Sequence, residues 1–187
     1  MPFPKAIVLF ATIFVLFASQ AVKADEWDDA TRAITRLDPK EFRTLPNHIL
    51  EKLTTQSCTI PQSFENNSPH NVINGEFGKT GQKDWAILCS RKDTSSILIF
   101  WGGRASCPSE ILPSPDRSWL QQTVGGIGYS RVISTVDPKF ILKHADANEE
   151  STPAPITHQG INQTFVGKGS SVKYCFQGKW IELAGAD

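Results

Sequence analysis

The stretches DWAILCS at residues 84–90 and SSILIFW at residues 95–101, joined by the linker RKDT at 91–94, decide the fold. Both stretches have the length and the β-branched and aromatic content of strands, and the polar linker has the length of a hairpin connection. We therefore predict two antiparallel strands here, ended by Gly102 and Gly103.

Side chains alternate between the two faces of a strand, so the first stretch can be divided by position. Trp85, Ile87 and Cys89 fall on one face, and Ala86 and Leu88 fall on the other. Because both faces are apolar, we expect the hairpin to lie centrally, covered on each side.

Helical patterns precede this hairpin. Asp38, Pro39 and Glu41 have the order of a capping box with proline at the first helical position. We therefore predict an α+β fold class, in which N-terminal helices over 25–57 pack on a mostly antiparallel β-sheet built from the β-rich residues 58–187 and stapled by disulfides.

Proline, glycine and polar residues interrupt the β-rich part twice. Residues 104–128 hold three prolines and a glycine pair, and residues 145–156 are polar and contain prolines. We predict an irregular loop in each place. Because too little chain follows the second loop to build another core, we expect 25–187 to form a single domain.

Residues 1–24 have the layout of a secretory signal peptide. One lysine precedes an apolar run, and Val22 and Ala24 are the small residues at positions −3 and −1 of a cleavage site before Asp25. The run is shorter than the roughly 20 residues that span a bilayer. We therefore expect cleavage, a periplasmic or extracellular location, and no stable membrane insertion afterwards.

The charge balance excludes one class of partner. The chain has 19 Lys and Arg against 19 Asp and Glu, and removal of Lys5 and Lys23 with residues 1–24 leaves a net charge of −2. Nucleic-acid-binding domains carry a basic excess. We therefore expect no nucleic-acid partner, and we expect a monomer whose partner is an envelope protein or a small ligand.

The cysteines agree with export. Cys58, Cys89, Cys107 and Cys175 lack the close spacing of a zinc site, and an even number in an oxidising compartment predicts two disulfides. Three connectivities are possible. We favour the pairs Cys58–Cys89 and Cys107–Cys175.

The most patterned stretch is NGEFGKTGQKDWA at 74–86. It resembles an FG-GAP-type propeller hairpin, in which a strand enters an acidic calcium loop and leaves as an apolar strand. The resemblance implies metal ligands at Glu76, Thr80 and Asp84. Because Lys83 adds a positive charge and the segment occurs once, we favour the alternative of a glycine-rich turn with no cofactor.

Several other segments carry a wider resemblance. They are CTIP at 58–61, VINGEF at 72–77, QKDWAILCS at 82–90, GYS at 128–130 and the residues from His158 onward. Together they look like a group of secreted bacterial proteins of unknown function. The resemblance implies a fold and an exported location, and it carries over no catalytic residue.

No complete catalytic motif is present, since the chain contains neither GxSxG nor HExxH. The alternative of a secreted hydrolase uses His158 as the base with Glu76 or Asp84 as its acid–base partner. Trp119 and His158 are candidate ligand-binding residues, because an aromatic ring can stack on a sugar or a peptide. We predict a non-catalytic binding domain of the cell envelope, with the hydrolase and a calcium-stabilised module as alternatives.

Overall fold

The computed structural model describes residues 25–147 and 155–186, and the predicted signal peptide lies outside them. At the centre is the predicted hairpin of β4 (Asp84–Arg91) and β5 (Thr94–Phe100), which pair antiparallel. Lys92 and Asp93 form the turn with φ of 51° and 56°, the positive values that a tight two-residue hairpin requires. The hairpin prediction is confirmed.

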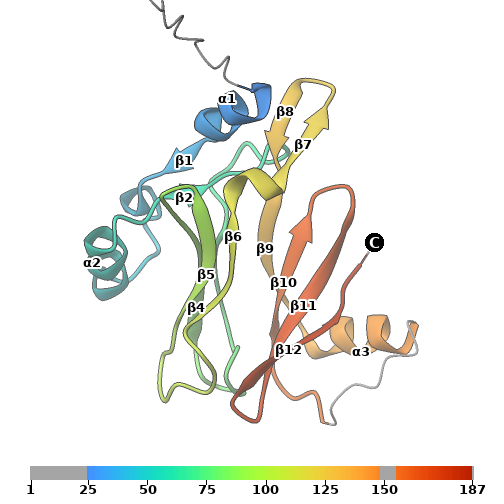
Figure 1. The fold of residues 1–187 in the computed structure, drawn as a ribbon. Helices are drawn as coiled ribbons and strands as arrows, with labels where there is room; N and C mark the ends of the chain where they lie inside the picture. The colour runs from blue at the N-terminus through green and yellow to red at the C-terminus, as the bar shows by residue number, and fades with distance from the viewer. Residues whose placement is uncertain (1–24, 148–154, 187) are drawn as a thin grey trace, which may run out of the picture.

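Two four-stranded antiparallel sheets follow one another along the chain, and each is a meander in which neighbouring strands are consecutive. The first contains β3 (Val72–Gly75), β4, β5 and β6 (Glu110–Pro115). The second contains β9 (Arg131–Val136), β10 (Gly160–Phe165), β11 (Gly169–Phe176) and β12 (Lys179–Ala184). Figure 1 shows the two sheets beside each other.

The two faces of β4 are buried in different places, as the alternation predicts. Trp85, Ile87 and Cys89 share a cluster with residues of α2 (Asn47–Thr55). Ala86 and Leu88 share another cluster with residues of β9 and β10. The first sheet is therefore covered by a helix on one side and by the second sheet on the other.

The second sheet has its own helix, α3 (Pro138–Ala147). Ile141 of this helix is fully buried with Val172 and Leu183 of the sheet. A Cβ at Gly160 would lie 2.6 Å from Val172 Cγ1 and 3.2 Å from Ile141 Cδ1, so the helix approaches this closely only because residue 160 is glycine.

One buried amide joins the sheets. Asn71, with φ of 69°, donates from Nδ2 to the carbonyl oxygens of Pro61 and Arg131, at 2.7 and 3.2 Å. Its Oδ1 accepts from the Ile133 amide at 2.9 Å. The side chain thus supplies β9 with the backbone partners that an adjacent strand would provide.

Short elements surround the sheets. They are α1 (Glu26–Ala33), β1 (Arg36–Leu37), the 3-10 helix η1 (Pro39–Glu41), β2 (Ile60–Pro61), the 3-10 helix η2 (Asp116–Trp119), β7 (Leu120–Thr123) and β8 (Gly126–Tyr129). The predicted capping box is present in η1, where the Asp38 side chain accepts from the Lys40 amide and Glu41 accepts from the Asp38 amide.

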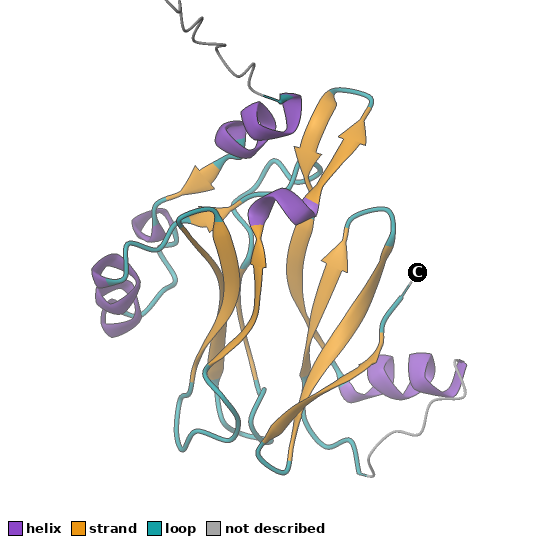
Figure 2. Ribbon diagram, in the orientation of Figure 1, coloured by secondary structure: helices purple, strands orange, loops and turns teal. Residues whose placement is uncertain are grey.

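The predicted α+β fold class is wrong, because most of the regular structure is antiparallel β-sheet. The described residues contain three α-helices, of 8 to 10 residues, and these lie at the edges of the molecule (Figure 2). The helical pattern before Cys58 breaks at Ile34. This residue follows the last turn of α1, and its side chain packs in the core. No residue of α1 is buried, and α2 is the one N-terminal α-helix that contributes buried residues to the core.

The irregular loops also differ from expectation. Residues 104–128 contain β6, η2, β7 and most of β8, because Val124 and Gly125 form a two-residue hairpin turn rather than a loop. Of the loop predicted at 145–156, residues 145–147 belong to α3 and residues 148–154 lie outside the described part.

The favoured disulfide pairing is confirmed. Cys58–Cys89 and Cys107–Cys175 have Cα–Cα distances of 5.5 and 6.0 Å. The first links the end of α2 to β4, and the second links the chain between β5 and β6 to β11. In the described ranges no helix is long and apolar enough to cross a membrane.

Candidate functional site

The β7–β8 hairpin projects from the end of the two sheets (Figure 1). Its residues form one side of a groove. Thr123 closes its turn by donating from Oγ1 to the Gly126 carbonyl at 2.7 Å and accepting from the Gly125 amide at 3.2 Å. Gly126 has φ of 114°, which a residue with a side chain rarely adopts. The T-V-G-G order at 123–126 is the sequence signal that could have identified this hairpin.

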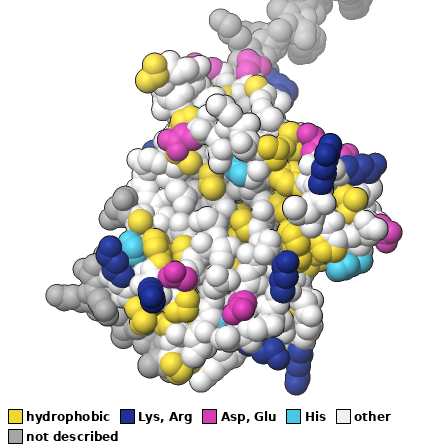
Figure 3. Space-filling view, turned by 180° about the vertical axis from the view of Figure 1, so that it is seen from behind, with side chains coloured by type: hydrophobic (Ala, Val, Ile, Leu, Met, Phe, Trp, Pro, Cys, Tyr) yellow, Lys and Arg dark blue, Asp and Glu magenta, His cyan; other side chains and the backbone are white. Residues whose placement is uncertain are grey.

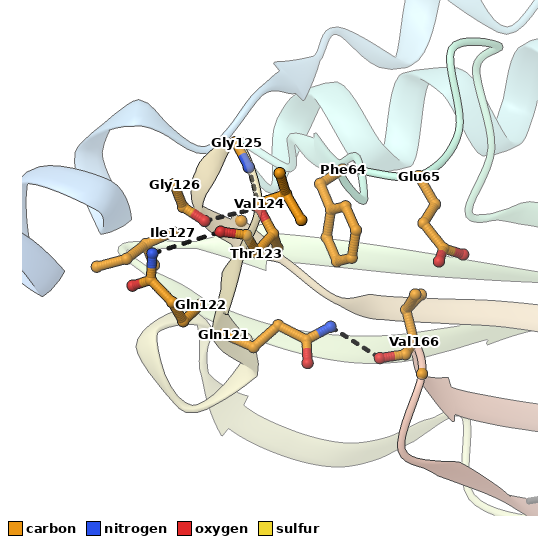
Figure 4. Close-up of a pocket in the computed structure, with 12 residues that line it drawn as sticks. Phe64, Glu65, Gln121, Gln122, Thr123, Val124, Gly125, Gly126, Ile127 and Val166 are labelled. Carbon is orange, nitrogen blue, oxygen red and sulfur yellow. Dashed lines mark hydrogen bonds between the residues drawn. The ribbon is translucent and has the colours of Figure 1, made fainter.

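The opposite side of the groove comes from two distant segments. Phe64 donates its amide to the Tyr129 carbonyl at 2.9 Å, and its side chain lies over Gly128, where an added Cβ would be 2.8 Å from Phe64 Cβ. Val166 accepts from the Gln121 side chain at 2.7 Å. Figure 4 shows Phe64, Val166 and the hairpin around the groove, whose volume is about 600 Å³.

Exposed apolar side chains gather at this groove. Phe64 is 42% exposed and Val124, at the hairpin turn, is fully exposed. Leu142 of α3 is the other large apolar side chain that the described residues expose. Two of these three side chains therefore line one cavity, together with glycine backbone and a single carboxylate, Glu65. Sequence reasoning missed this site, because Phe64 and Val124 are 60 positions apart.

Asp84, a candidate metal ligand and acid–base group, is fully buried. Its Oδ2 accepts from the amides of Phe77 and Gly78 at 3.1 and 2.9 Å. Its Oδ1 accepts from Gln82 Nε2 at 2.8 Å and from the Gly102 amide at 2.9 Å. The carboxylate therefore holds the 76–84 loop in shape by binding four N–H groups.

The other two candidate metal ligands are attached to a different segment. The Glu76 amide donates to Gln159 Oε1 at 2.9 Å, and Thr80 Oγ1 donates to the Thr157 carbonyl at 2.6 Å. Across residues 25–147 and 155–186, no three His, Cys, Asp or Glu side chains gather as a metal-binding group.

His158 is brought near this loop, because its neighbour Gln159 contacts Glu76, but its ring is occupied. Nδ1 lies 2.9 Å from the Gln159 carbonyl oxygen and Nε2 lies 3.0 Å from that of Cys175. The ring also stacks on Tyr174 with centroids 4.3 Å apart. These contacts hold the segment before β10 against β11.

Trp119, a candidate ligand-binding residue, is half-buried, and two side chains of the second sheet pack against its ring. Its ring stacks on Phe165 with centroids 5.5 Å apart, and the Arg131 guanidinium carbon lies 4.7 Å from the ring centroid. Its indole nitrogen is buried with no hydrogen-bond partner among the described residues.

Asp116 and Tyr129 belong to buried polar contacts between the elements. Asp116 is fully buried, and its Oδ2 accepts from Arg36 at 2.8 Å and from the Ser90 hydroxyl at 2.5 Å. The Tyr129 hydroxyl lies 3.2 Å from Ser95 Oγ. Burial raises the pKa of Tyr129, and the negative charge of Asp116 raises that pKa further. The positive charges nearby oppose this shift only in part.

The raised pKa of Tyr129 predicts a loss of stability in alkali. Above about pH 10 the unfolded chain releases the phenolic proton and the folded chain keeps it, so the free energy of unfolding falls by up to about 1.4 kcal/mol per pH unit. Urea unfolding between pH 9 and pH 11.5 should show this fall, and Tyr129→Phe should flatten it. Equal slopes for the two proteins would refute the shift.

Charged side chains of both signs are interspersed on the face shown in Figure 3.

Comparisons of the chain with protein-family models, with curated proteins and with solved structures find no match. The resemblances of residues 74–86 to an FG-GAP-type hairpin and of the mature chain to secreted bacterial proteins therefore stay predictions.

Proposed function

We propose that this protein is an exported, monomeric, non-catalytic binding protein of the cell envelope, and that the groove beside the β7–β8 hairpin receives an apolar segment of a partner protein. One observation carries the proposal: Phe64 and Val124, two of the three exposed large apolar side chains of the described residues, line the same cavity. Clustered exposed apolar side chains mark interaction sites, whereas scattered ones do not.

The chemistry of the groove supports a protein partner. Covering an exposed apolar side chain of this size is worth about 1.5–3 kcal/mol. Nothing lies within 4 Å of the place where a Cβ would stand on Gly126, so the backbone there leaves room for close approach. The two disulfides support an exported location, because such bonds persist in oxidising compartments.

The hydrolase and calcium alternatives draw less support. A general base needs a ring nitrogen that can reach a substrate, and both nitrogens of His158 lie against carbonyl oxygens. A calcium ligand needs free carboxylate oxygens, and those of Asp84 accept four N–H groups.

Photo-crosslinking tests the proposal. A benzophenone side chain placed at Val124 should give a discrete adduct in the cells that export the protein, and the same side chain at the exposed Glu51 of α2 should not. Phe64→Ser should reduce the Val124 adduct at least about tenfold, as expected when one side of an apolar site is removed. Adduct yields that are equal at the two positions, or insensitive to Phe64→Ser, would refute the proposal.

A further inference from the structure

The outer face of the second sheet is only partly covered by α3. The apolar end, which includes Val136 and Val172, packs under the helix. Beyond the helix the same face carries polar side chains at paired positions. Ser134 lies opposite Asn162 on β9 and β10, and Thr164 lies opposite Ser170 on β10 and β11. Hydroxyl and amide groups therefore occupy positions beyond the helix where apolar side chains would have extended the core.

Asn162 is the unusual member of this row. Its side chain donates from Nδ2 to Thr164 Oγ1 at 3.0 Å, and the residue is only 8% exposed. Its Oδ1 is buried with no hydrogen-bond partner among the described residues. A buried acceptor without a donor is unfavourable, and a bound hydroxyl or N–H group would relieve it.

Asn162 lines a cavity of about 490 Å³. Ser134, Thr164 and Ser170 line it with hydroxyl groups, and Phe140 of α3 lines it with an aromatic ring. The volume falls in the range of small-molecule sites, and a few convergent polar groups beside an aromatic ring are typical of such sites.

The charges select among ligands. Among the residues that the structure describes, no Asp or Glu lines the cavity, so these residues offer a cation no counterion. Lys168 is the single cation among the described lining residues, and its Nζ already lies 4.3 Å from the centroid of the Phe165 ring. The lining therefore suits a neutral ligand with many hydroxyl groups.

We propose that this cavity, formed by Asn162, Thr164, Ser134, Ser170 and Phe140, binds a neutral sugar the size of one or two hexose rings. A sugar hydroxyl would donate to Asn162 Oδ1, the serine and threonine hydroxyls would exchange hydrogen bonds with the ring substituents, and the apolar face of the sugar would contact Phe140. The proposal does not rest on the protein partner proposed for the other groove.

Saturation-transfer NMR of the disulfide-intact mature protein tests the proposal, with glucose, galactose, mannose and N-acetylglucosamine as separate probes. We expect at least one to bind with a dissociation constant of about 1 mM. Asn162→Ala and Thr164→Val should each weaken that binding about tenfold or more. Gln122→Ala, in the groove beside the β7–β8 hairpin, should leave binding unchanged.

Urea unfolding of the Asn162→Ala variant separates a loss of sugar binding from a loss of folding stability. If Asn162 Oδ1 serves a ligand and not the fold, the urea midpoint of Asn162→Ala should equal or exceed the urea midpoint of the native chain. The proposal is overturned if none of the four sugars binds the folded protein, if Asn162→Ala binds as well as the native chain, or if Gln122→Ala loses as much binding. Marked destabilisation by Asn162→Ala would also overturn it, since the oxygen would then serve the fold.

Discussion

Replacing Arg131 with methionine is expected to lower the free energy of unfolding by about 3–5 kcal/mol. The side chain of Arg131 is fully buried, which lowers the pKa of its guanidinium. Nη1 donates to the Ser95 carbonyl at 2.7 Å and to Ser95 Oγ at 2.9 Å, and Nη2 donates to the Leu112 carbonyl at 2.8 Å. Nη2 and Nε donate to Gln163 Oε1 at 2.6 and 3.1 Å.

These bonds explain the size of the expected loss. Arg131 belongs to β9, and its partners belong to β5, β6 and β10, so one side chain connects the two sheets. Methionine has a similar length but no donor, and it would leave buried acceptors in both sheets unpaired. Arg131→Lys keeps a charge but has one point donor in place of a planar fork, so it should recover only part of the loss.

Equilibrium unfolding in urea measures the effect. Arg117→Met is the matched control, because the Arg117 side chain is exposed and its ion pairs with Asp25 and Asp28 lie at the surface. That variant should change stability little, since surface ion pairs contribute little. If Arg131→Met were as stable as Arg117→Met, the network would not join the sheets energetically.

Removing the Cys107–Cys175 disulfide by a double alanine substitution is expected to cost about 4 kcal/mol. The two cysteines are 68 residues apart, and a longer closed loop restricts the unfolded chain more strongly. The bond also pins the chain before β6 onto β11 of the other sheet. Beside it, Trp180 donates to the Pro108 carbonyl at 2.8 Å and stacks on Trp101 with centroids 6.0 Å apart.

The second disulfide provides the comparison. Cys58 and Cys89 are 31 residues apart and connect parts that pack on the first sheet, so removing this bond should cost a few tenths of a kcal/mol less in chain entropy. The intact mass of the native chain should rise by about 4 Da on reduction, as two disulfides require. A free thiol in the unreduced protein, or no loss of stability in the Cys107 and Cys175 variant, would contradict the expectation.

The parts of the fold that depend on near neighbours could be predicted. Alternation in 84–90 identified a strand covered on both faces, and the order of Asp38, Pro39 and Glu41 identified a helix start. The helical layer was overestimated because the pattern around α1 resembles an amphipathic helix. Its Ile34 instead leaves the helix and packs between the sheets.

The candidate sites could not be predicted, because their members come together only through tertiary contacts. Phe64 meets Val124 at a groove, and Arg131 lies 36 positions from its partner Ser95. The polar residues Asn162 and Thr164 of β10 line a cavity with Phe140 of α3 only in the folded chain. Their spacing in the chain carries no signal for these contacts.

The sequence by itself therefore determined the strands of the central hairpin, the helix cap and the four cysteines that pair, since periodicity and turn chemistry act between adjacent residues. Tertiary structure alone decided that the helices lie at the edges of the molecule (Figure 2), that a buried arginine joins two sheets, and that the two cavities form where they do. These features depend on how one sheet lies against another, which is set by the packing of residues 30 to 60 positions apart.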